Sequence, residues 1–486
     1  MSLPPVPSLR VRDCNAAPIR AGGEFVLYWM IAYRRPTWNF ALQHAAAIAE
    51  RLCRPLVILE ALRCNYRWAS DRLHRFVIDG MADNARALTH GAACYYPYVE
   101  PARSAGTGLL EALAARACAV VTDDFPCFFL PGMVRRVAAA LDVRVIAVDS
   151  NGLLPMRAAA DTYPTAYAFR RFLQRTLPAH LVEPPVESPL RGLKLPSIGR
   201  GLDEIRRRWP AADFSAGDGP RLSELPIDHG VAAAPVRGGF ASGSRRLRDF
   251  LGSGIDRYAE DRNKPGEDAS SGLSPYLHFG HVSVHEIFAG LVDREEWTPD
   301  RLGRSTAGKR EGWWGMEGVE GFLDELVTWR ELGFNMCHLR DDYDRYESLP
   351  EWARATLEKH AGDPRSHVYS LEQFEAAATH DPLWNAAQRQ IVREGRMHNY
   401  LRMLWGKKIL EWSATPRDAL ATMIHLNNKY GLDGRNPNSY TGIFWVLGRY
   451  DRPWGPERPI FGTVRYMSSE NTARKFDVKG YIARFQ

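Results

Sequence analysis

The sequence predicts an α/β domain with a parallel sheet, followed by an all-helical domain. Short apolar runs alternate with amphipathic stretches from about Phe25 to Asp149, a pattern typical of parallel strands covered by helices on both faces. A stretch rich in Pro, Gly and Arg follows, and beyond it helical periodicity dominates and convincing strands are absent. We therefore expect an α/β domain over residues 22–183, a linker over 184–244 and a helical domain over 245–486.

Five apolar runs predict the strands of the α/β domain. They are FVLYWMI (25–31), PLVILEAL (55–62), ACYYPYVE (93–100), AVVTDD (119–124) and VRVIAVDS (143–150). Helical stretches between them include residues 38–52 and 109–117. The pattern is Rossmann-like, but no G-x-G-x-x-G motif follows any of these strands, so the glycine-rich dinucleotide loop is missing. We therefore do not expect this domain to hold a flavin as a Rossmann domain does.

Two segments with little periodicity are expected on the surface. The first is the linker at 184–244, whose many Pro and Gly residues favour an exposed connection. The second is Thr298–Gly318, TPDRLGRSTAGKREGWWGMEG, which reads as a polar insertion. We expect a surface loop there.

Composition indicates an ordinary globular protein, with 45% hydrophobic and 25% charged residues. The 63 Lys and Arg against 57 Asp and Glu give a formal net charge of +6. This total does not demonstrate nucleic-acid binding, because phosphate neutralisation is a local effect. Seven scattered cysteines without a C-x-x-C pair argue against a disulfide framework, a zinc site or an iron–sulfur cluster. The N-terminus lacks an apolar signal core and no apolar run could span a bilayer, so we expect a cytoplasmic protein without membrane contact. We also expect a monomer.

The segment Asp381–Trp412 carries three tryptophans in and around one amphipathic helix. Trp405 and Trp412 are seven residues apart, nearly two helical turns, so they share a face with a rise of roughly 10 Å between them. Such rings can simply pack a core stripe. They can also carry an electron between a buried redox centre and the surface if Trp384, on the preceding segment, fills the gap. Spacing alone leaves both interpretations open.

Several long motifs resemble the class II DNA photolyases, flavoproteins that use light to split cyclobutane pyrimidine dimers. The motifs are VLYWMIAYRRPTWNFAL (26–42), SSGLSPYLHFGHVS (270–283), FLDELVTWRELGFN (322–335), DPLWNAAQ (381–388), GRMHNYLRMLWGKKILEW (395–412) and LNNKYGLDGRNPNSY (426–440). They occur in order over most of the chain. The resemblance implies that the helical domain binds FAD.

A serine-rich segment before a predicted helix is one candidate for flavin binding. Ser271, Gly272 and Ser274 offer hydroxyl and backbone N–H groups that can bind a diphosphate, although serines before a helix usually mean only an N-cap. The resemblance implies FAD contacts for Tyr258, Ser271, Gly272, Leu273, Ser274, Arg402, Asn427 and Asp433.

The resemblance also places Asn427 near flavin N5 and pairs Arg402 with Asp433. A nearby cation and a neutral amide would stabilise the reduced anionic flavin. An Arg–Asp pair far apart in sequence is more often structural, and it gains weight here because both residues lie inside matching motifs. The chain departs from the family at Asn436, where a second Asp is usual. This change is expected to alter flavin tuning slightly.

The resemblance assigns substrate contacts to residues of both halves of the helical domain. A dimer taken out of the duplex needs an apolar pocket with a few hydrogen-bonding groups. Photolyases are among the enzymes that flip their target base out of the duplex. The residues implied are Trp329, Trp445 and Met403 for packing, Glu325 for a hydrogen bond to the pyrimidine carbonyl, and Arg262 and Arg465 for the DNA-facing surface. Basic and aromatic residues alternate in the C-terminal tail, which fits a nucleic-acid surface or a solvated helix face equally well.

These observations predict a light-dependent DNA-repair lyase that transfers an electron from reduced FAD to a flipped dimer in DNA. Glu325 and Asn427 would take part in catalysis, and Trp405, Trp384 and Trp412, in that order outward, would reduce oxidised flavin. The resemblance implies a deazaflavin antenna, but no motif in residues 1–180 predicts a binding site for it. The first alternative is a cryptochrome-like blue-light photoreceptor that signals to a protein partner. The second is a light-independent, flavin-containing nucleic-acid-binding protein.

Overall fold

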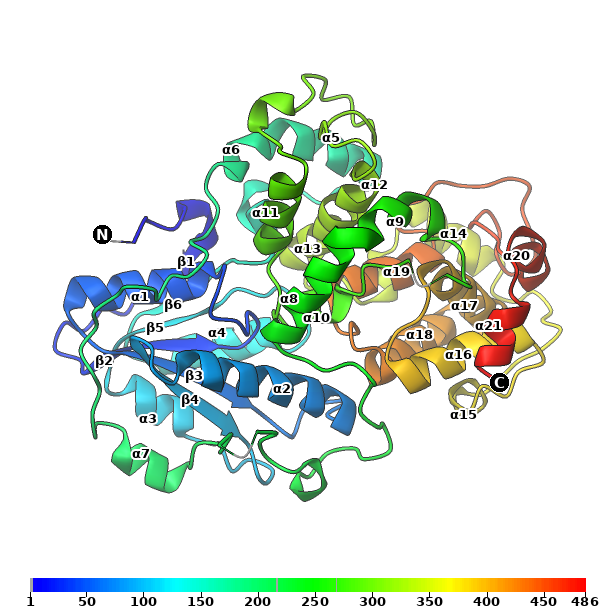
Figure 1. Ribbon diagram of the computed structural model, residues 1–486. Coiled ribbons are helices and arrows are strands. Elements are labelled where there is room, and N and C mark those ends of the chain that lie inside the picture. Colours follow the sequence, from blue (N-terminus) through cyan, green and yellow to red (C-terminus); the bar gives the residue numbers. More distant parts are fainter. Residues whose placement is uncertain (1–2, 216, 268) are drawn as a thin grey trace. The chain divides into compact units, whose positions relative to one another are not determined.

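The chain forms two compact units, each assembled from separate stretches of sequence. The computed structural model describes residues 3–215, 217–267 and 269–486 (Figure 1). Unit 1 comprises Met1–Ala158, Thr176–Leu251 and Gly272–Pro299, and unit 2 comprises Ala159–Arg175, Gly252–Ser271 and Asp300–Gln486. The units thus interleave along the chain, whereas the boundaries expected from sequence divide it in order. Those boundaries stay a prediction.

Unit 1 is built on a six-stranded sheet with the order β1-β6-β5-β2-β3-β4. The strands are β1 (Val11–Asp13), β2 (Phe25–Met30), β3 (Leu56–Leu62), β4 (Ala93–Val99), β5 (Ala117–Asp123) and β6 (Val145–Val148). Neighbouring strands are parallel, except that β1 pairs antiparallel with β6. The predicted α/β fold class is confirmed. The sequence missed β1, since three residues with two charges give no apolar run.

Burial explains why β2, and β5 up to Val121, are apolar. Every residue of both strands is buried, as expected for parallel strands covered on both faces. Helix α1 (Phe40–Leu52) packs against β2, β5 and β6, and α2 (Asp71–Leu88) packs against β3 and β4. The side chain of Asn39 accepts the N–H groups of Ala41 and Leu42, which fixes the start of α1. The other α-helices of unit 1 are α3 (Leu109–Ala114), α4 (Leu130–Ala140), α6 (Pro178–Leu181), α7 (Asp203–Arg208), α8 (Phe240–Asp249), α10 (Ser274–His278) and α11 (Val284–Arg294).

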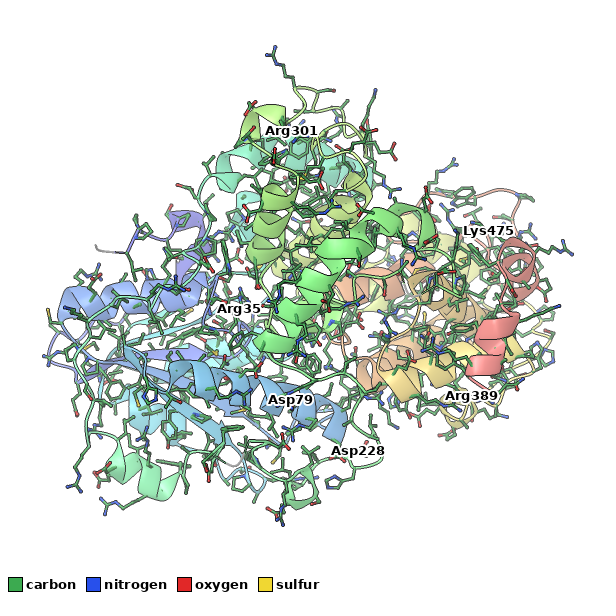
Figure 2. The ribbon with its side chains drawn as sticks, in the orientation of Figure 1. Arg35, Asp79, Asp228, Arg301, Arg389 and Lys475 are labelled. Atoms are coloured by element: carbon green, nitrogen blue, oxygen red, sulfur yellow. The ribbon has the colours of Figure 1, made fainter. Side chains whose placement is uncertain are left out.

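The segment predicted as a linker is held against unit 1 by buried side chains and hydrogen bonds. Trp209 and Leu225 are buried, and the Trp209 indole donates to the backbone oxygen of Ala105 across 3.0 Å. Near the end of the segment, the carboxylate of Asp79 on α2 accepts the N–H of Gly238 at 3.0 Å (Figure 2). Apolar anchors therefore fix a chain segment that Pro and Gly make irregular.

The predicted polar insertion at Thr298–Gly318 is largely irregular but turns two indoles inward. Trp313 and Trp314 are both buried. The carboxylate of Glu320 accepts the backbone N–H groups of Trp314 and Gly315 at 2.9 and 3.1 Å. Burial of the indoles and this carboxylate together organise a segment whose composition indicated only a surface loop.

Unit 2 is helical, as predicted. Its α-helices, with the π-helical turn η6 (Asp324–Trp329), are α5 (Ala166–Thr176), α9 (Ile255–Asp261), α12 (Glu320–Leu323), α13 (Arg330–Leu339), α14 (Glu351–Lys359), α15 (Leu371–Glu375), α16 (Pro382–Glu394), α17 (Asn399–Trp412), α18 (Pro416–Tyr430), α19 (Pro437–Val446), α20 (Ser469–Lys475) and α21 (Lys479–Arg484). Its described residues form isolated β-bridges and no strand. Across the described chain, no helix is long and apolar enough to cross a membrane.

Two glycines allow helices of unit 2 to approach α19 closely. A β-carbon on Gly333 of α13 would lie 2.5 Å from Oγ1 of Thr441, and one on Gly406 of α17 would lie 2.6 Å from a methyl of Val446. Both distances are shorter than van der Waals contact. The backbones of α13 and α17 therefore pack directly on α19, which brings the motif segments 322–335, 395–412 and 426–440 together.

Candidate active site

Glu325 and Trp329 share the open side of the π-helical turn η6. The four other residues of η6 that lie between or beside them, Asp324, Leu326, Val327 and Thr328, are buried. Glu325 and Trp329 are only half-buried. A π-helical turn is rare and frequently marks a functional site. The sequence predicted a helix here but gave no signal for its π form.

Three residues expected in separate roles form one cluster beside η6. The Arg262 guanidinium, just after α9, donates to Oε1 of Glu325 across 2.6 Å. Its guanidinium carbon lies 5.4 Å from the centroid of the Tyr258 ring, and that ring meets Phe322 edge-on at 5.3 Å. Burial, reinforced by the Glu325 charge, raises the pKa of Tyr258 to about 12, so the phenol stays protonated at neutral pH.

A second ion pair, between Arg170 and Asp324, holds η6. Arg170 of α5 donates to both carboxylate oxygens of Asp324, at 2.8 and 3.1 Å. The Asp324 side chain is 4% exposed, and a bidentate guanidinium satisfies a buried carboxylate well. Because Asp324 precedes Glu325 directly, this pair sets the direction in which Glu325 leaves the helix.

Arg402, Asn427 and Asp433 lie on α17, on α18 and just after α18. Arg402 donates to both oxygens of Asp433 at 3.2 and 3.3 Å. Its Nε is buried without a hydrogen-bond partner among the described residues. Asn427 is 2% exposed, and its amide donates to the Ser439 hydroxyl and, at 3.2 Å, to Asn428. The site thus combines a cation with an unused donor and a fixed neutral amide.

The loop carrying Asp433 is held by Arg435, which sequence reasoning missed. Arg435 is buried and adopts a left-handed backbone with φ of 62°. Its guanidinium donates to the backbone oxygens of Asn428, Gly431 and Leu432 at the end of α18. A cation is favourable at the carboxyl end of a helix. The G-x-D-G-x-N-P turn chemistry was the only sequence signal for this arrangement.

Asn436, the departure from the family pattern, is the N-cap of α19. Its side-chain oxygen accepts the N–H of Asn438 at 3.0 Å. Asn and Asp are about equally effective at this position. The substitution therefore preserves the structural role of the residue.

The predicted diphosphate segment divides between the units: Ser271 belongs to unit 2, and Gly272, Leu273 and Ser274 belong to unit 1. Gly272 has a φ of +66°, and a β-carbon there would lie 2.7 Å from Nε of Arg246. Only glycine suits this backbone. Leu273 is buried and precedes α10, a helix of five residues with Pro275 in its first turn.

Trp445 lies half-buried near the end of α19, close to Arg465. Arg465 donates to both oxygens of Asp451 at 2.8 and 3.1 Å, stacks on Trp454 at 3.9 Å and reaches to 5.6 Å from the Trp445 ring. The methyl of Met403 would touch a β-carbon at Gly442, one turn before Trp445, at 3.5 Å. Met403, Trp445 and Arg465 therefore gather around α19.

The three tryptophans form one continuous group of rings. Trp384 lies 6.5 Å from Trp405, with the planes only 4° apart, and 6.0 Å from Trp412 at an interplanar angle of 69°. The Trp384 indole donates to the backbone oxygen of Trp405 at 3.0 Å, and the Trp405 indole donates to Gln388 at 2.9 Å. Trp384 therefore fills the space between the two rings of α17.

Trp412 is 1% exposed, so it does not itself reach the surface. Its ring contacts Tyr369 at 5.7 Å and His380 at 4.9 Å. The Tyr369 hydroxyl lies 2.7 Å from Nδ1 of His380, and His380 is exposed. The ring contacts thus continue from Trp412 outward, through residues that the sequence analysis did not single out.

The architecture of an α/β unit and a helical unit is that of a photolyase fold. A solved structure of a bacterial class III photolyase from Agrobacterium tumefaciens superimposes with a TM-score of 0.66, covering 95% of this chain and 86% of that one. Its sequence is 17% identical, so this likeness shows the fold alone. No protein-family model matches the chain.

Curated relatives extend the comparison over nearly the full sequence. A deoxyribodipyrimidine photo-lyase from Methanothermobacter thermautotrophicus is 34% identical over 478 residues, covering 98% of both chains. One from Oryza sativa is 35% identical, covering 98% of this chain and 90% of the relative, and one from Potorous tridactylus is 33% identical, covering 96% and 82%. The chain therefore belongs to the deoxyribodipyrimidine photo-lyase family, a family of lyases.

Proposed function

We propose that this protein is a class II photolyase that uses light and FAD to reverse cyclobutane pyrimidine dimers in DNA. The observation that carries the proposal is the pair of half-buried side chains, Glu325 and Trp329, on the open side of η6. Trp445 and Met403 lie around α19, against which α13, the continuation of η6, packs closely. One carboxylate and several soft or aromatic surfaces suit a flipped, largely apolar dimer.

The residues of the cofactor site fit a flavin. When bound, reduced FAD supplies an excited electron to the dimer. Arg402 offers its buried, unused Nε to an acceptor atom, and its positive charge, balanced by Asp433, favours an anionic ring system. Asn427 holds a buried neutral amide on α18, the helix that packs against α17. Tyr258 and Ser271, which belong to the same unit, would bind the remainder of the cofactor.

On the substrate side, DNA must replace two internal ion pairs. In the ligand-free protein Arg262 is bound to Glu325 and Arg465 to Asp451. Phosphate contacts by both arginines release these carboxylates, and Glu325 becomes available to the dimer. The overall reaction would break the two carbon–carbon bonds that join the pyrimidines, without net oxidation or reduction.

We infer that Trp405, Trp384 and Trp412 reduce oxidised FAD, in that order outward. Ring separations of 6.5 and 6.0 Å support short hops, whereas the direct step along α17 spans roughly 10 Å. A pure packing role remains the competing interpretation, because all three rings are buried. A substitution that keeps the packing separates the two.

We further propose that unit 1 carries an antenna of the deazaflavin type. Half-buried aromatic rings gather after the carboxyl ends of β3 and β5, where parallel sheets commonly bind ligands. Trp68 lies 5.9 Å from Phe128 at an interplanar angle of 27°, and Phe128 lies 4.9 Å from Phe129. Both Trp68 and Phe128 adopt left-handed backbones. A separate absorption band besides those of flavin, in purified protein, tests this assignment.

The decisive experiment is repair itself. Flavin-loaded, reduced protein should restore a dimer-containing oligonucleotide under blue light and leave it unchanged in the dark. A cryptochrome-like photoreceptor would have no need of Glu325 together with both indoles. Binding of the lesion without repair in light would favour the photoreceptor. A light-independent binding protein would show neither repair nor flavin photoreduction. The monomeric state and the cytoplasmic location stay predictions.

A further inference from the structure

Lys407 is a fully buried amine next to the residues expected to bind DNA. It lies on α17 with none of its surface exposed. Its Nζ donates to the backbone oxygen of Val446, the last residue of α19, across 2.6 Å. The same nitrogen lies 5.0 Å from the centroid of the Trp445 ring. A single side chain therefore holds both the end of α19 and the indole it carries.

The contact to Val446 completes the capping of α19. The backbone N–H groups of Gly448 and Arg449 donate to the oxygens of Trp445 and Phe444 at 3.0 Å, whereas Val446 oxygen receives the lysine. A cation at the carboxyl end of a helix is favourable, and a cation near an indole face is favourable too. The close packing of Gly406 on Val446 brings this part of α17 within reach.

The charged surroundings of Lys407 come from the segment after α19. Asp451 favours its ammonium form, and Arg465 opposes it. No described residue of α16, α18 or α19 is a charged neighbour of the amine, and the next residue on α17, Lys408, pairs with Glu411 instead. Burial, aided by Arg465 and opposed by Asp451, lowers the pKa of Lys407 to about 7. The amine is thus poised between its two forms at neutral pH.

We propose that Lys407 is a positioning residue for Trp445 that takes up a proton when a DNA phosphate draws Arg465 away from Asp451. This role rests on the proposed function, because it requires DNA at the Trp445–Arg465 surface. Before binding, Arg465 neutralises Asp451. After binding, the phosphate neutralises Arg465, and Asp451 loses its guanidinium partner while it keeps the hydrogen bonds from Arg452 and Trp454. Both changes favour the ammonium form, and the proton comes from solvent.

Proton uptake can be measured without any repair. A short duplex with one cyclobutane thymine dimer is titrated in the dark into flavin-loaded protein, by calorimetry in PIPES, HEPES and Tris buffers. The dependence of the heat on buffer ionisation enthalpy gives the protons bound. At pH 7 we expect uptake of about half a proton per complex, decreasing toward zero at about pH 5.5, where the ammonium form is already present.

Variants identify the group that takes up the proton. Lys407→Met should abolish uptake and weaken binding of the dimer, and Lys408→Met is the matched control that should keep wild-type uptake and affinity. In the free wild-type protein, carbon-13 labelling of lysine should show one buried amine titrating near pH 7. Absence of that titration, or tight binding by wild type without proton uptake, would overturn the role of Lys407. Failure of wild type to bind the duplex would instead contradict the proposed function.

Discussion

The guanidinium of Arg262 and the carboxylate of Glu325 are joined by a 2.6 Å hydrogen bond, so a residue expected to face the DNA backbone is bound to one expected to face the dimer. Their side chains are 16% and 33% exposed, which leaves the pair accessible to a ligand from one side. Under the proposed function, a phosphate that bound Arg262 would also free Glu325. This exchange would couple DNA binding to dimer recognition.

Replacing Glu325 with Ala should reduce light-driven repair by roughly tenfold or more, because a hydrogen bond to a charged group is worth about 1.5–3 kcal/mol. Flavin content should stay at the wild-type level. Affinity for undamaged DNA should not fall, since Arg262 is released from its partner. Repair yield, flavin absorbance and binding isotherms measure the three quantities. Glu325→Gln keeps the shape of the side chain and has an amide N–H that can donate to a pyrimidine carbonyl, so it should retain more activity. Loss of flavin in Glu325→Ala would show that this residue serves the cofactor.

Replacing Trp384 with Phe tests whether the three indoles conduct. Most of the apolar bulk remains, so a packing role predicts a modest stability loss and normal photoreduction. A conducting role predicts folded protein with bound FAD, repair intact after chemical reduction, and photoreduction of oxidised FAD strongly impaired. Illumination with an external reductant, followed by absorbance, gives the rate. Trp313→Phe, a buried indole outside the group, is the control. Wild-type photoreduction in Trp384→Phe would exclude Trp384 as the middle link.

Changing Asn436 to Asp should leave both stability and the flavin spectrum close to wild type, because either residue caps α19 equally well. Asn436→Ala should lower the free energy of unfolding by about 1 kcal/mol. Thermal or denaturant unfolding of the flavin-loaded protein measures this difference. A shift of the flavin bands or of its reduction potential in Asn436→Asp would instead support a tuning role for this residue.

Lys407 should make stability depend on pH above neutrality. Its folded pKa of about 7 lies below the ordinary value of 10.5, so between these values the unfolded chain binds more protons. The free energy of unfolding contributed by this group is therefore lowest below pH 7 and rises as pH increases toward 10.5. Unfolding curves at pH 6, 8 and 9.5 should show this rise in wild type but not in Lys407→Met. Equal slopes for the two proteins would contradict a depressed pKa.

The order of strands and helices was largely predictable, because burial on both faces leaves a direct trace in sequence. All residues of β2 and β5 are apolar or buried for that reason. Strand β1 left no such trace, since its three residues lie at a partly exposed edge. The π form of η6 was also hidden, because a π turn and an α turn place Glu325 and Trp329 at almost the same spacing.

The candidate site was predictable as a set of residues and much less as a set of contacts. Motif matches indicated Arg262, Glu325 and Arg465 one by one. The pairing of Arg262 with Glu325, and of Arg465 with Asp451, depends on how α9, η6 and the segment after α19 pack. No local sequence pattern encodes such contacts. The role of Lys407 was also not predictable. In the sequence it is one of two consecutive lysines, and only its complete burial in the structure distinguishes it.

The bond between Arg170 and Asp324 has a consequence for how this protein can be divided or recombined. Arg170 precedes the predicted linker at 184–244, yet belongs with the helical unit. A fragment starting at residue 245 would remove the bidentate Arg170 partner of the buried Asp324 carboxylate and keep the longer 3.5 Å contact to Arg310, which should lower the free energy of unfolding. In a chimera whose junction lies within residues 184–244, Arg170 would come from one parent protein and Asp324 from the other. Residues 159–175 should therefore be kept together with the C-terminal half when that half is expressed alone or exchanged between proteins.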